Sequence, residues 1–215
     1  MGVVFCYLCC LTQVPKTSAF VESDPDVIQG GEIVLTEFGI KGKTSGDFIT
    51  HSSAFWAINT NTGIYGATGA TVEEQWDFHY FDDANGKYYK LVHAHDMTHF
   101  LKVQGAPHFN PTVLTAAYTR FDDQYIRWNL VQSDGTTLVE GAVANTGSGV
   151  TYYLVNVGRD RCMAVHYAVM NPGAASFSHL QDSVTSEAKT STGNWPSSCE
   201  VELIDLSQAT TAPPV

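Results

Sequence analysis

Short runs of alternating apolar and polar residues recur along most of the chain and are separated by turn-forming residues. Phe48-Ile49-Thr50 and Phe100-Leu101-Lys102 begin two of these runs, and Trp76 and Trp128 lie in two others. This period of two is typical of β-strands, and no long stretch shows the period of an amphipathic helix. Dense turn signals, such as Asn61-Thr62-Gly63, lie between the runs. The pattern therefore predicts an all-β chain.

The runs repeat at a fixed spacing. Phe48 precedes Phe100 by 52 positions, and Trp76 precedes Trp128 by the same 52 positions. A third copy follows with insertions, in which Cys162-Met163-Ala164-Val165 takes the place of the run that begins at Phe100. Self-similarity at one period indicates a repeat architecture. We therefore expect three units of four strands, at 32–38, 47–51, 63–68 and 75–80; 88–93, 99–103, 112–118 and 125–131; and 151–156, 161–166, 174–180 and 199–205. An alternative alignment uses Phe55-Trp56 and shifts the first unit by seven residues.

One domain, residues 20–206, accommodates these units, with repeats at about 32–87, 88–150 and 151–206. A disordered tail is expected at 207–215, and the Ser/Thr-rich stretch 183–194 is interpreted as a polar loop. With 44% hydrophobic and 15% charged residues, the chain has enough apolar material for a core.

The first 19 residues contain an apolar run, Met1–Leu11, that is too short to span a bilayer. Its length matches the apolar region of a signal peptide, although no Lys or Arg precedes it; a lipidated segment and an extra packed strand are the alternatives. Removal of residues 1–19 would leave one pair of cysteines, Cys162 and Cys199, as an exported protein prefers. We therefore expect a secreted chain with this disulfide; the alternatives are a cytoplasmic chain and two buried thiols.

Three four-strand units resemble the β-trefoil fold, in which threefold closure buries the inward faces and removes open edges. Arg161–Val165 followed by Asn171-Pro172, and His99–Gly105 followed by Asn110-Pro111, most resemble the ricin-B-type (R-type) lectins and their fungal relatives. That resemblance implies a carbohydrate-binding protein and no enzyme. The family's Gln-x-Trp motif is not intact, and its sugar-binding Asp is replaced by Thr50, Lys102 and Ala164.

A second resemblance concerns the opening of the first unit. Gly30-Gly31 with Val34-Leu35 is similar to the first element of Kunitz-type protease inhibitors, which act through a loop after their fourth strand. The matching connection here, 81–87, is short and acidic. Protease inhibition is the alternative function, and a non-catalytic trefoil that binds a protein partner is a third.

A sugar site needs an aromatic face and a few convergent hydrogen-bonding groups. In a trefoil these groups would come from loops at one rim of each unit. The candidates are Trp56, Asn61, Asp96, His108, Phe109, Asn110, Tyr118, Asp122, Asp160, Tyr167, Asn171, His179 and Asp182. Trp76 and Trp128 keep the repeat spacing and are assigned to the core instead.

Metal binding is a separate hypothesis for His93 and His95, which share one face of a strand, with His99 returning across the hairpin. No further Cys or His pair completes the site, so no cofactor is expected; titration with Zn²⁺ tests the point. Motifs for nucleophilic, metallopeptidase or nucleotide chemistry are absent from the sequence.

The formal net charge of −11 disfavours a nucleic-acid partner and, for the same reason, an anionic membrane surface, so no membrane insertion is expected. The expected partners are glycans or glycoproteins. The sequence leaves the oligomeric state open, with a homodimer among the options.

Overall fold

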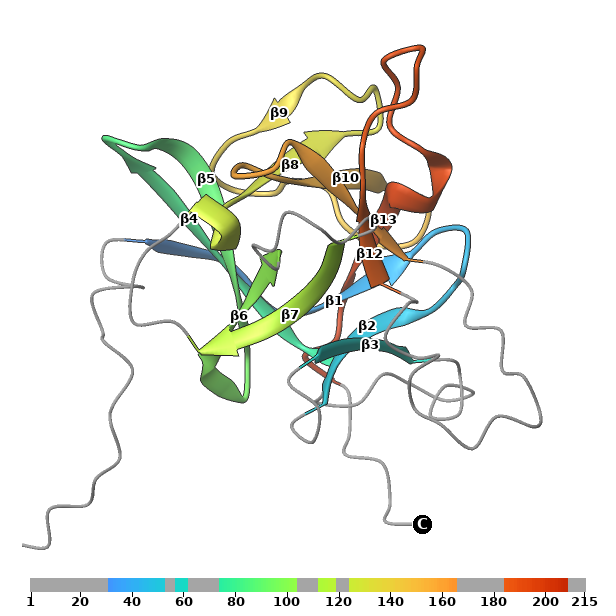
Figure 1. Ribbon diagram of the computed structural model, residues 1–215. Coiled ribbons are helices and arrows are strands. Elements are labelled where there is room, and N and C mark those ends of the chain that lie inside the picture. The colour runs from blue at the N-terminus through green and yellow to red at the C-terminus, as the bar shows by residue number, and fades with distance from the viewer. Residues whose placement is uncertain are drawn as a thin grey trace, which may run out of the picture.

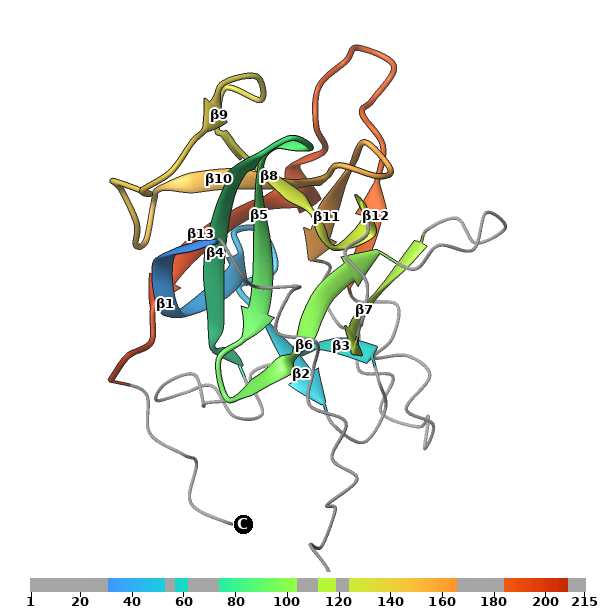
Figure 2. The same ribbon diagram turned by 90° about the vertical axis from the view of Figure 1, so that its left-hand side faces the viewer.

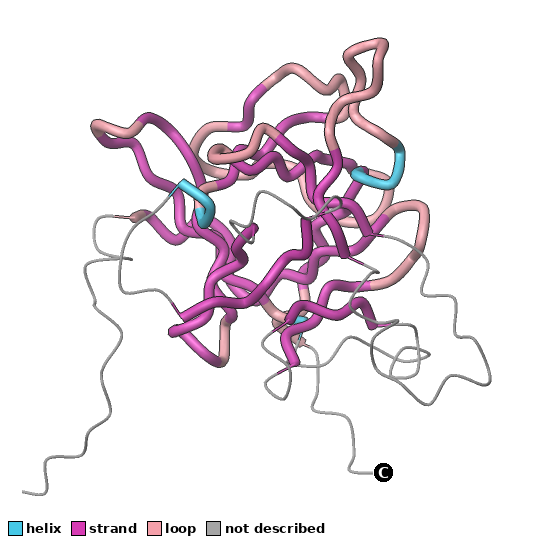
Figure 3. Tube along the Cα trace, in the orientation of Figure 1, coloured by secondary structure: helices cyan, strands magenta, loops and turns pink. Residues whose placement is uncertain are grey.

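The computed structural model describes residues 31–52, 57–61, 74–103, 112–118, 124–165 and 184–208. Strands dominate these residues, which contain short 3₁₀ turns but no α-helix (Figure 3). Among them, no helix has the length and apolar character needed to cross a membrane. The expectation for residues 1–19 lies outside this part of the chain, as does the expected tail beyond Gln208. The predicted domain and repeat boundaries stay predictions.

Six of the described strands close into a barrel. Each pairs antiparallel with the next, in the order β1–β4–β5–β8–β10–β13 and back to β1. The closure leaves no open edge in this ring, which is how β proteins avoid unpaired backbone groups. Their bounds are β1 Glu32–Gly42, β4 Trp76–Asp83, β5 Gly86–His93, β8 Trp128–Gln132, β10 Thr151–Asn156 and β13 Glu200–Asp205.

Three hairpins accompany the barrel. Strand β2 pairs with β3, β6 with β7, and β11 with β12. The hairpins also meet one another, since β12 pairs with β7 and β3 lies beside both (Figures 1 and 2). In both views the β2–β3 and β6–β7 hairpins lie toward the bottom and β9 toward the top. Their bounds are β2 Phe48–Ser52, β3 Ala57–Asn61, β6 Asp96–Val103, β7 Thr112–Tyr118, β11 Arg161–Val165 and β12 Val184–Glu187, and the short β9 is Leu138–Val139.

The barrel interior is filled by a layer with threefold repetition. Three cross-strand pairs contribute one side chain from each barrel strand, and all six are fully buried. Apolar side chains at the centre of such a layer supply the main driving force for closure. The pairs are Ile40 with Leu203, Leu91 with Phe78, and Leu154 with Leu130.

Trp76 and Trp128 are also fully buried, as the repeat spacing predicts. The indole N–H of Trp128 donates to the carbonyl of Leu101 at 2.8 Å, so this ring ties the barrel to the β6–β7 hairpin. Strand register supports the equivalence of Phe48 and Phe100, which are 52 positions apart. Phe48 faces Lys41 and Phe100 faces Val92, and each of these residues directly follows a core residue, Ile40 or Leu91. Alignment on Phe55 is therefore wrong.

The strands that pair with β2 and β11 lie at positions where the sequence did not predict them. The strand that pairs with β2 is β3, Ala57–Asn61, whereas the predicted strand 63–68 lies outside the described residues. The strand that pairs with β11 is β12, Val184–Glu187, within the stretch interpreted as a polar loop; the predicted strand 174–180 also lies outside the described residues. Val184 and Ser186 are fully buried, so a strand with a small polar residue on its inner face was mistaken for a loop.

The connection between β4 and β5 is as short as the sequence indicates. Only Ala84 and Asn85 separate β4 from β5. Asp83 accepts a hydrogen bond from the amide of Asn85 at 2.7 Å, which closes a tight turn. No segment projects here that could enter a protease cleft.

Candidate functional site

The turn that follows the first barrel strand of each unit makes the same backbone contact in all three units. The amides of Lys43, Ala94 and Val157 donate to the carbonyls of Glu200, Gln75 and Arg127, each at 2.9 Å. Each acceptor lies at or just before the start of a barrel strand. We call these places rim site 1 (residues 43–47 with Ser197–Glu200), rim site 2 (94–95 with 74–75) and rim site 3 (157–160 with 124–127).

At rim site 3 the turn between β10 and β11 packs against the 3₁₀ turn η3, Gln124–Ile126. The fully buried Asn156 ends β10, and its amide nitrogen donates to the carbonyls of Tyr125 at 2.8 Å and Arg127 at 3.2 Å. Gly158 donates to the carbonyl of Gln124 at 3.1 Å. A Cβ at Gly158 would lie 2.7 Å from Gln124 Cγ and 2.8 Å from Tyr125 Cδ1, so glycine permits this close approach.

Polar and aromatic groups of rim site 3 are held on this rigid base. The Arg159 guanidinium lies 5.2 Å from the centroid of the half-buried Tyr125 ring. Asp160 is exposed and has a φ of 46°, and its amide donates to the carbonyl of Asn156 at 2.8 Å. The left-handed conformation is one that Asp tolerates better than most residues. The side-chain oxygen of Asn156 is buried and accepts no hydrogen bond in the structure.

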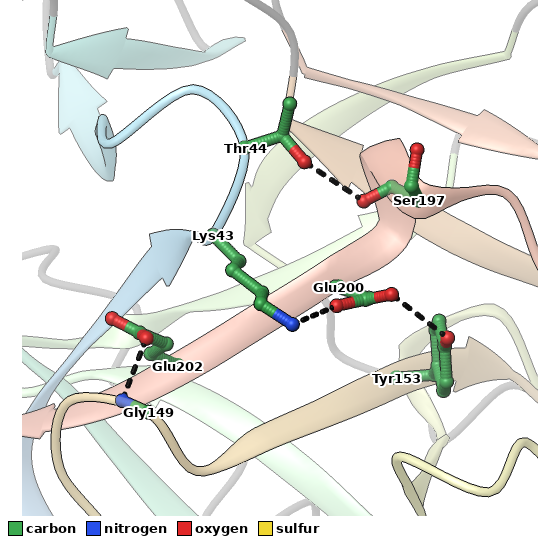
Figure 4. Close-up of polar contacts among 7 residues, drawn as sticks. All are labelled: Lys43, Thr44, Gly149, Tyr153, Ser197, Glu200 and Glu202. Atoms are coloured by element: carbon green, nitrogen blue, oxygen red, sulfur yellow. Dashed lines mark hydrogen bonds and ion pairs between the residues drawn. The ribbon is translucent and has the colours of Figure 1, made fainter.

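Rim site 1 has the same backbone contact but a different set of side chains, drawn in Figure 4. Lys43 Nζ lies 2.5 Å from Glu200 Oε2, and the Tyr153 hydroxyl donates to Glu200 Oε1 at 3.4 Å. Thr44 Oγ1 donates to the carbonyl of Ser197 at 3.3 Å, in the 3₁₀ turn η6, Ser197–Cys199. The cation and the carboxylate of this site therefore pair with each other.

These contacts change the proton affinities at rim site 1. The hydrogen bond and negative charge of Glu200 raise the pKa of Lys43 above its ordinary value. Burial, followed by the charge of Glu200, raises the pKa of Tyr153. Both groups keep their protons to higher pH than in an unfolded chain.

Rim site 2 contains part of the predicted metal site. His95 Nε2 donates to the side-chain oxygen of Gln75, whose amide nitrogen donates to the carbonyl of Leu206 at 2.7 Å. The buried His93 meets Trp76 edge-on, with ring centroids 5.5 Å apart. The His93 and His95 centroids are 6.3 Å apart, and the side chain of His99 lies outside the described residues. Among the side chains that are described, no three His, Cys, Asp or Glu gather as metal ligands.

The predicted cysteine pair forms a disulfide, Cys162–Cys199, with a Cα–Cα distance of 5.8 Å. It joins β11 to the end of η6, and both cysteines are fully buried. Trp195 and Tyr153 belong to the same buried cluster, and Lys189 Nζ lies 4.6 Å from the Trp195 ring centroid. The disulfide therefore anchors the 3₁₀ turn that supplies Ser197 to rim site 1.

Of the predicted sugar-site residues, Asp160 is the one whose side chain the structure describes, and it is exposed in rim site 3. Three others are placed by their backbones alone: Asn61 ends β3, Asp96 begins β6 and Tyr118 ends β7. The remaining candidates lie outside the described residues: Trp56, His108, Phe109, Asn110, Asp122, Tyr167, Asn171, His179 and Asp182.

Sequence reasoning missed Tyr125, Asn156 and Arg159, which belong to rim site 3 together with Asp160. Tyr125 lay in a predicted strand, and its partner Arg159 is 34 positions away. The signal that could have been used was the Arg159-Asp160-Arg161 run beside a turn glycine.

Comparison with known proteins gives a likeness in fold. No family model and no curated protein matches the chain. The SDF2-like protein from Arabidopsis thaliana matches with a TM-score of 0.55 and 7% identity, over 81% of this chain and 95% of that one. A Caenorhabditis elegans protein of unknown function matches with a TM-score of 0.52 and 10% identity, over 81% and 97%.

A third solved structure, SeviL bound to asialo-GM1 saccharide, has a TM-score of 0.48 and 14% identity, over 81% of this chain and 98% of that one. Identities this low bear on the fold alone. The closed six-stranded barrel, its three hairpins and the likeness to the Arabidopsis structure together show that the chain is a β-trefoil protein.

Proposed function

We propose that the chain binds carbohydrate and that rim site 3 is its binding site. The observation that carries the proposal is that Arg159 of the rim turn lies over the Tyr125 ring of η3, next to the exposed Asp160. Carbohydrate sites combine an aromatic ring, which packs against sugar C–H groups, with a few fixed polar groups. The exposed Asp160 carboxylate can accept hydrogen bonds from sugar hydroxyls.

Rigidity supports the same proposal. The turn is held by hydrogen bonds from Asn156, Val157 and Gly158 to the segment 124–127. Side chains on a base ordered before binding lose less conformational entropy when a ligand arrives. Sugars bind proteins weakly, so this smaller loss of entropy is a substantial part of their binding free energy.

The site differs from the one that the R-type lectin resemblance implies. Ala164, which stands where that family has a sugar-binding Asp, is fully buried in β11. A residue without a polar side chain and without exposure cannot bind a sugar hydroxyl. The proposal therefore uses the rim turn of the third unit and not the family's residue.

A glycan array with the full chain tests the proposal, followed by titration of the best glycan into Asp160→Asn. Asn keeps the left-handed backbone but removes the charge. A hydrogen bond to a charged group contributes about 1.5–3 kcal/mol, so binding should weaken by roughly ten- to a hundredfold. Asp82→Asn, an exposed carboxylate at the end of β4, is the matched control and should bind normally. A folded chain that binds nothing on the array would overturn the proposal.

A further inference from the structure

The outer face of the β4–β5 hairpin is buried, although both strands belong to the barrel. His79 is 4% exposed and its cross-strand neighbour Lys90 is 1% exposed, and Phe81 and its neighbour Tyr88 are 5% and 2% exposed. These four residues alternate with Phe78 and its partner in the barrel layer, so their side chains point away from the barrel axis. A lysine is almost never fully buried without a partner, so another part of the chain must pack on this face.

The described elements that pack against the hairpin lie beside it in the sheet. Strand β4 packs on β1 and β5, and β5 packs on β4, β6 and β8, and each of these is a hydrogen-bonded neighbour. A neighbour in the plane of a sheet leaves the face of a strand uncovered. Arg127, just before β8, contacts the Tyr88 ring, but within the described residues no element lies across the face. Most of its cover therefore comes from a segment outside them.

The buried side chains form one stack of aromatic rings and a cation. The rings of Phe81 and Tyr88 are parallel to within 8°, with centroids 5.3 Å apart. Lys90 Nζ lies 4.3 Å from the centroid of Phe81. The face thus combines apolar rings with a positive charge, in a chain whose net charge is −11. A partner that suits it is both apolar and acidic.

The chain reaches this face at Gly31, directly before β1. A Cβ at Gly31 would lie 2.6 Å from Cζ and 2.8 Å from Cε2 of Phe81, so the backbone rests against that ring. The ring in turn is stacked on Tyr88. Ile33, which pairs with His79, is 53% exposed, so the cover does not extend over β1. The position of Gly31 therefore points to the segment that precedes it as the cover of the hairpin.

Residues 20–30 have a composition that complements the face. Their sequence, Phe-Val-Glu-Ser-Asp-Pro-Asp-Val-Ile-Gln-Gly, contains large apolar residues and acids but no Lys or Arg. At about 3.3 Å per extended residue, this segment can reach about 36 Å, whereas the eight residues of β5 span roughly 26 Å. The segment is therefore long enough to cross the whole hairpin.

The third unit covers its outer face in a comparable way among the described residues. Val131, Tyr153 and Val155, on β8 and β10, are buried in one cluster with Trp195. Trp195 belongs to the chain between β12 and β13. A segment outside the barrel thus already serves as cover for two barrel strands in this fold.

We propose that residues 20–30 lie across the outer face of the β4–β5 hairpin, with apolar side chains on Phe81 and Tyr88 and a carboxylate beside Lys90. The face is then an interaction surface for an acidic, apolar peptide, and the chain supplies that peptide itself. A carboxylate at Lys90 offsets the cost of burying its ammonium group. This surface is separate from rim site 3 and does not depend on carbohydrate binding.

The test replaces residues 20–30 of the full chain by Gly and Ser and follows the acetylation of single lysines by mass spectrometry. In the parent chain, Lys90 should react far more slowly than Lys87, whose side chain is 45% exposed. The replacement should raise the rate at Lys90 by at least about tenfold, because a buried group loses its protection when its cover opens. The same replacement of residues 209–215 is the matched control and should leave the rate at Lys90 unchanged.

Tryptophan emission shows whether the replaced chain is folded, because Trp76 and Trp128 are fully buried in the core. An unchanged emission maximum with a faster reaction at Lys90 would support the inference. A folded chain in which Lys90 stays as slow as in the parent would overturn it and assign the cover to another segment.

Gly31→Ala keeps the inference testable if the replaced chain does not fold. Its methyl group would lie 2.6 Å from Phe81 Cζ, so the segment must move away from the ring. Lys90 should then be acetylated faster than in the parent chain, by a smaller factor than in the replaced chain. Glu32→Ala, at the exposed next residue, is the control and should match the parent. Equal rates at Lys90 in these two variants would overturn the inference.

Discussion

Rim sites 1 and 3 place the same backbone hydrogen bond beneath different side chains. In both, a turn amide meets a carbonyl at 2.9 Å, but Lys43 and Glu200 neutralise each other in rim site 1. In rim site 3, Arg159 lies on Tyr125 and Asp160 extends into solvent. Repeated architecture thus fixes the backbone of a site and leaves its chemistry to a few side chains. The charges of rim site 1 pair with each other, whereas rim site 3 is the copy proposed above to bind a ligand.

The largest expected effect comes from removal of the disulfide that anchors rim site 1. Loss of a native disulfide typically costs about 2–5 kcal/mol, and Cys162–Cys199 joins residues 37 apart. The double variant Cys162→Ala/Cys199→Ala should therefore have a lower free energy of unfolding by this amount, measured by urea denaturation.

The same variant should separate the two rim sites. Cys199 lies between Ser197 and Glu200, so η6 loses its attachment beside rim site 1. Hydrogen exchange should accelerate more at the amide of Lys43 than at the amide of Val157. Equal acceleration at the two amides would show that the disulfide acts on the whole fold and not on rim site 1.

The next effect concerns the close approach that builds rim site 3. Gly158→Ala would place a methyl group 2.7 Å from Gln124 Cγ and 2.8 Å from Tyr125 Cδ1, so the turn and η3 must separate. Overpacking of this kind costs about 1–3 kcal/mol, to be measured as a drop in unfolding free energy. Glycan binding should fall with it, because Tyr125 and Asp160 shift relative to each other.

Val157→Ala, at an exposed neighbour in the same turn, is the control and should change stability by no more than about 0.5 kcal/mol. If Gly158→Ala is as stable as the parent chain, the turn moves away from η3 at little cost. Rim site 3 is then not rigid.

The sequence predicted the barrel well because its signals are side chains in the core. Trp76 and Trp128 hold one spacing, and Phe48 and Phe100, which keep the same spacing, both pair with the barrel strand that precedes them. Strand β12 was missed because Ser and Thr in a buried strand have the composition of a loop.

The rim sites were harder to predict for a different physical reason. Their shared contact joins a backbone amide to a backbone carbonyl, and any residue other than proline provides both groups. The donors are Lys43, Ala94 and Val157, three residues with no common chemistry. The meeting of Arg159 with Tyr125 depends on tertiary packing and leaves no local pattern.

Alkaline pH should weaken the contacts of rim site 1. Burial raises the pKa of Tyr153 above 10.0, so above pH 10.0 the unfolded chain releases this proton first and gains stability relative to the fold. The raised pKa of Lys43 acts in the same direction. The stability that this shift contributes is complete below pH 10.5 and is lost as the pH rises through the raised pKa. Tyr153→Phe removes the first effect.

The loss of unfolding free energy as the pH rises above 10.0 should therefore be smaller in Tyr153→Phe than in the parent chain. Urea midpoints at matched pH values provide the measurement, with the difference at neutral pH as the reference for the lost hydroxyl. Parallel curves for the two chains would mean that Tyr153 titrates alike in the folded and unfolded states.

The smallest expected effect is that of Lys43→Met, although its ion pair is the most conspicuous contact of rim site 1. The Lys43 side chain is 48% exposed, and solvent and salt screen an exposed pair until its net contribution is small. The backbone hydrogen bond from Lys43 to Glu200 is unaffected by the substitution. We therefore expect the urea midpoint of Lys43→Met to match that of the parent chain. A double-mutant cycle with Glu200→Gln should give a coupling that shrinks as NaCl is added. A large coupling that resists salt would show that the ion pair itself holds rim site 1 closed, and the backbone would no longer be its principal support.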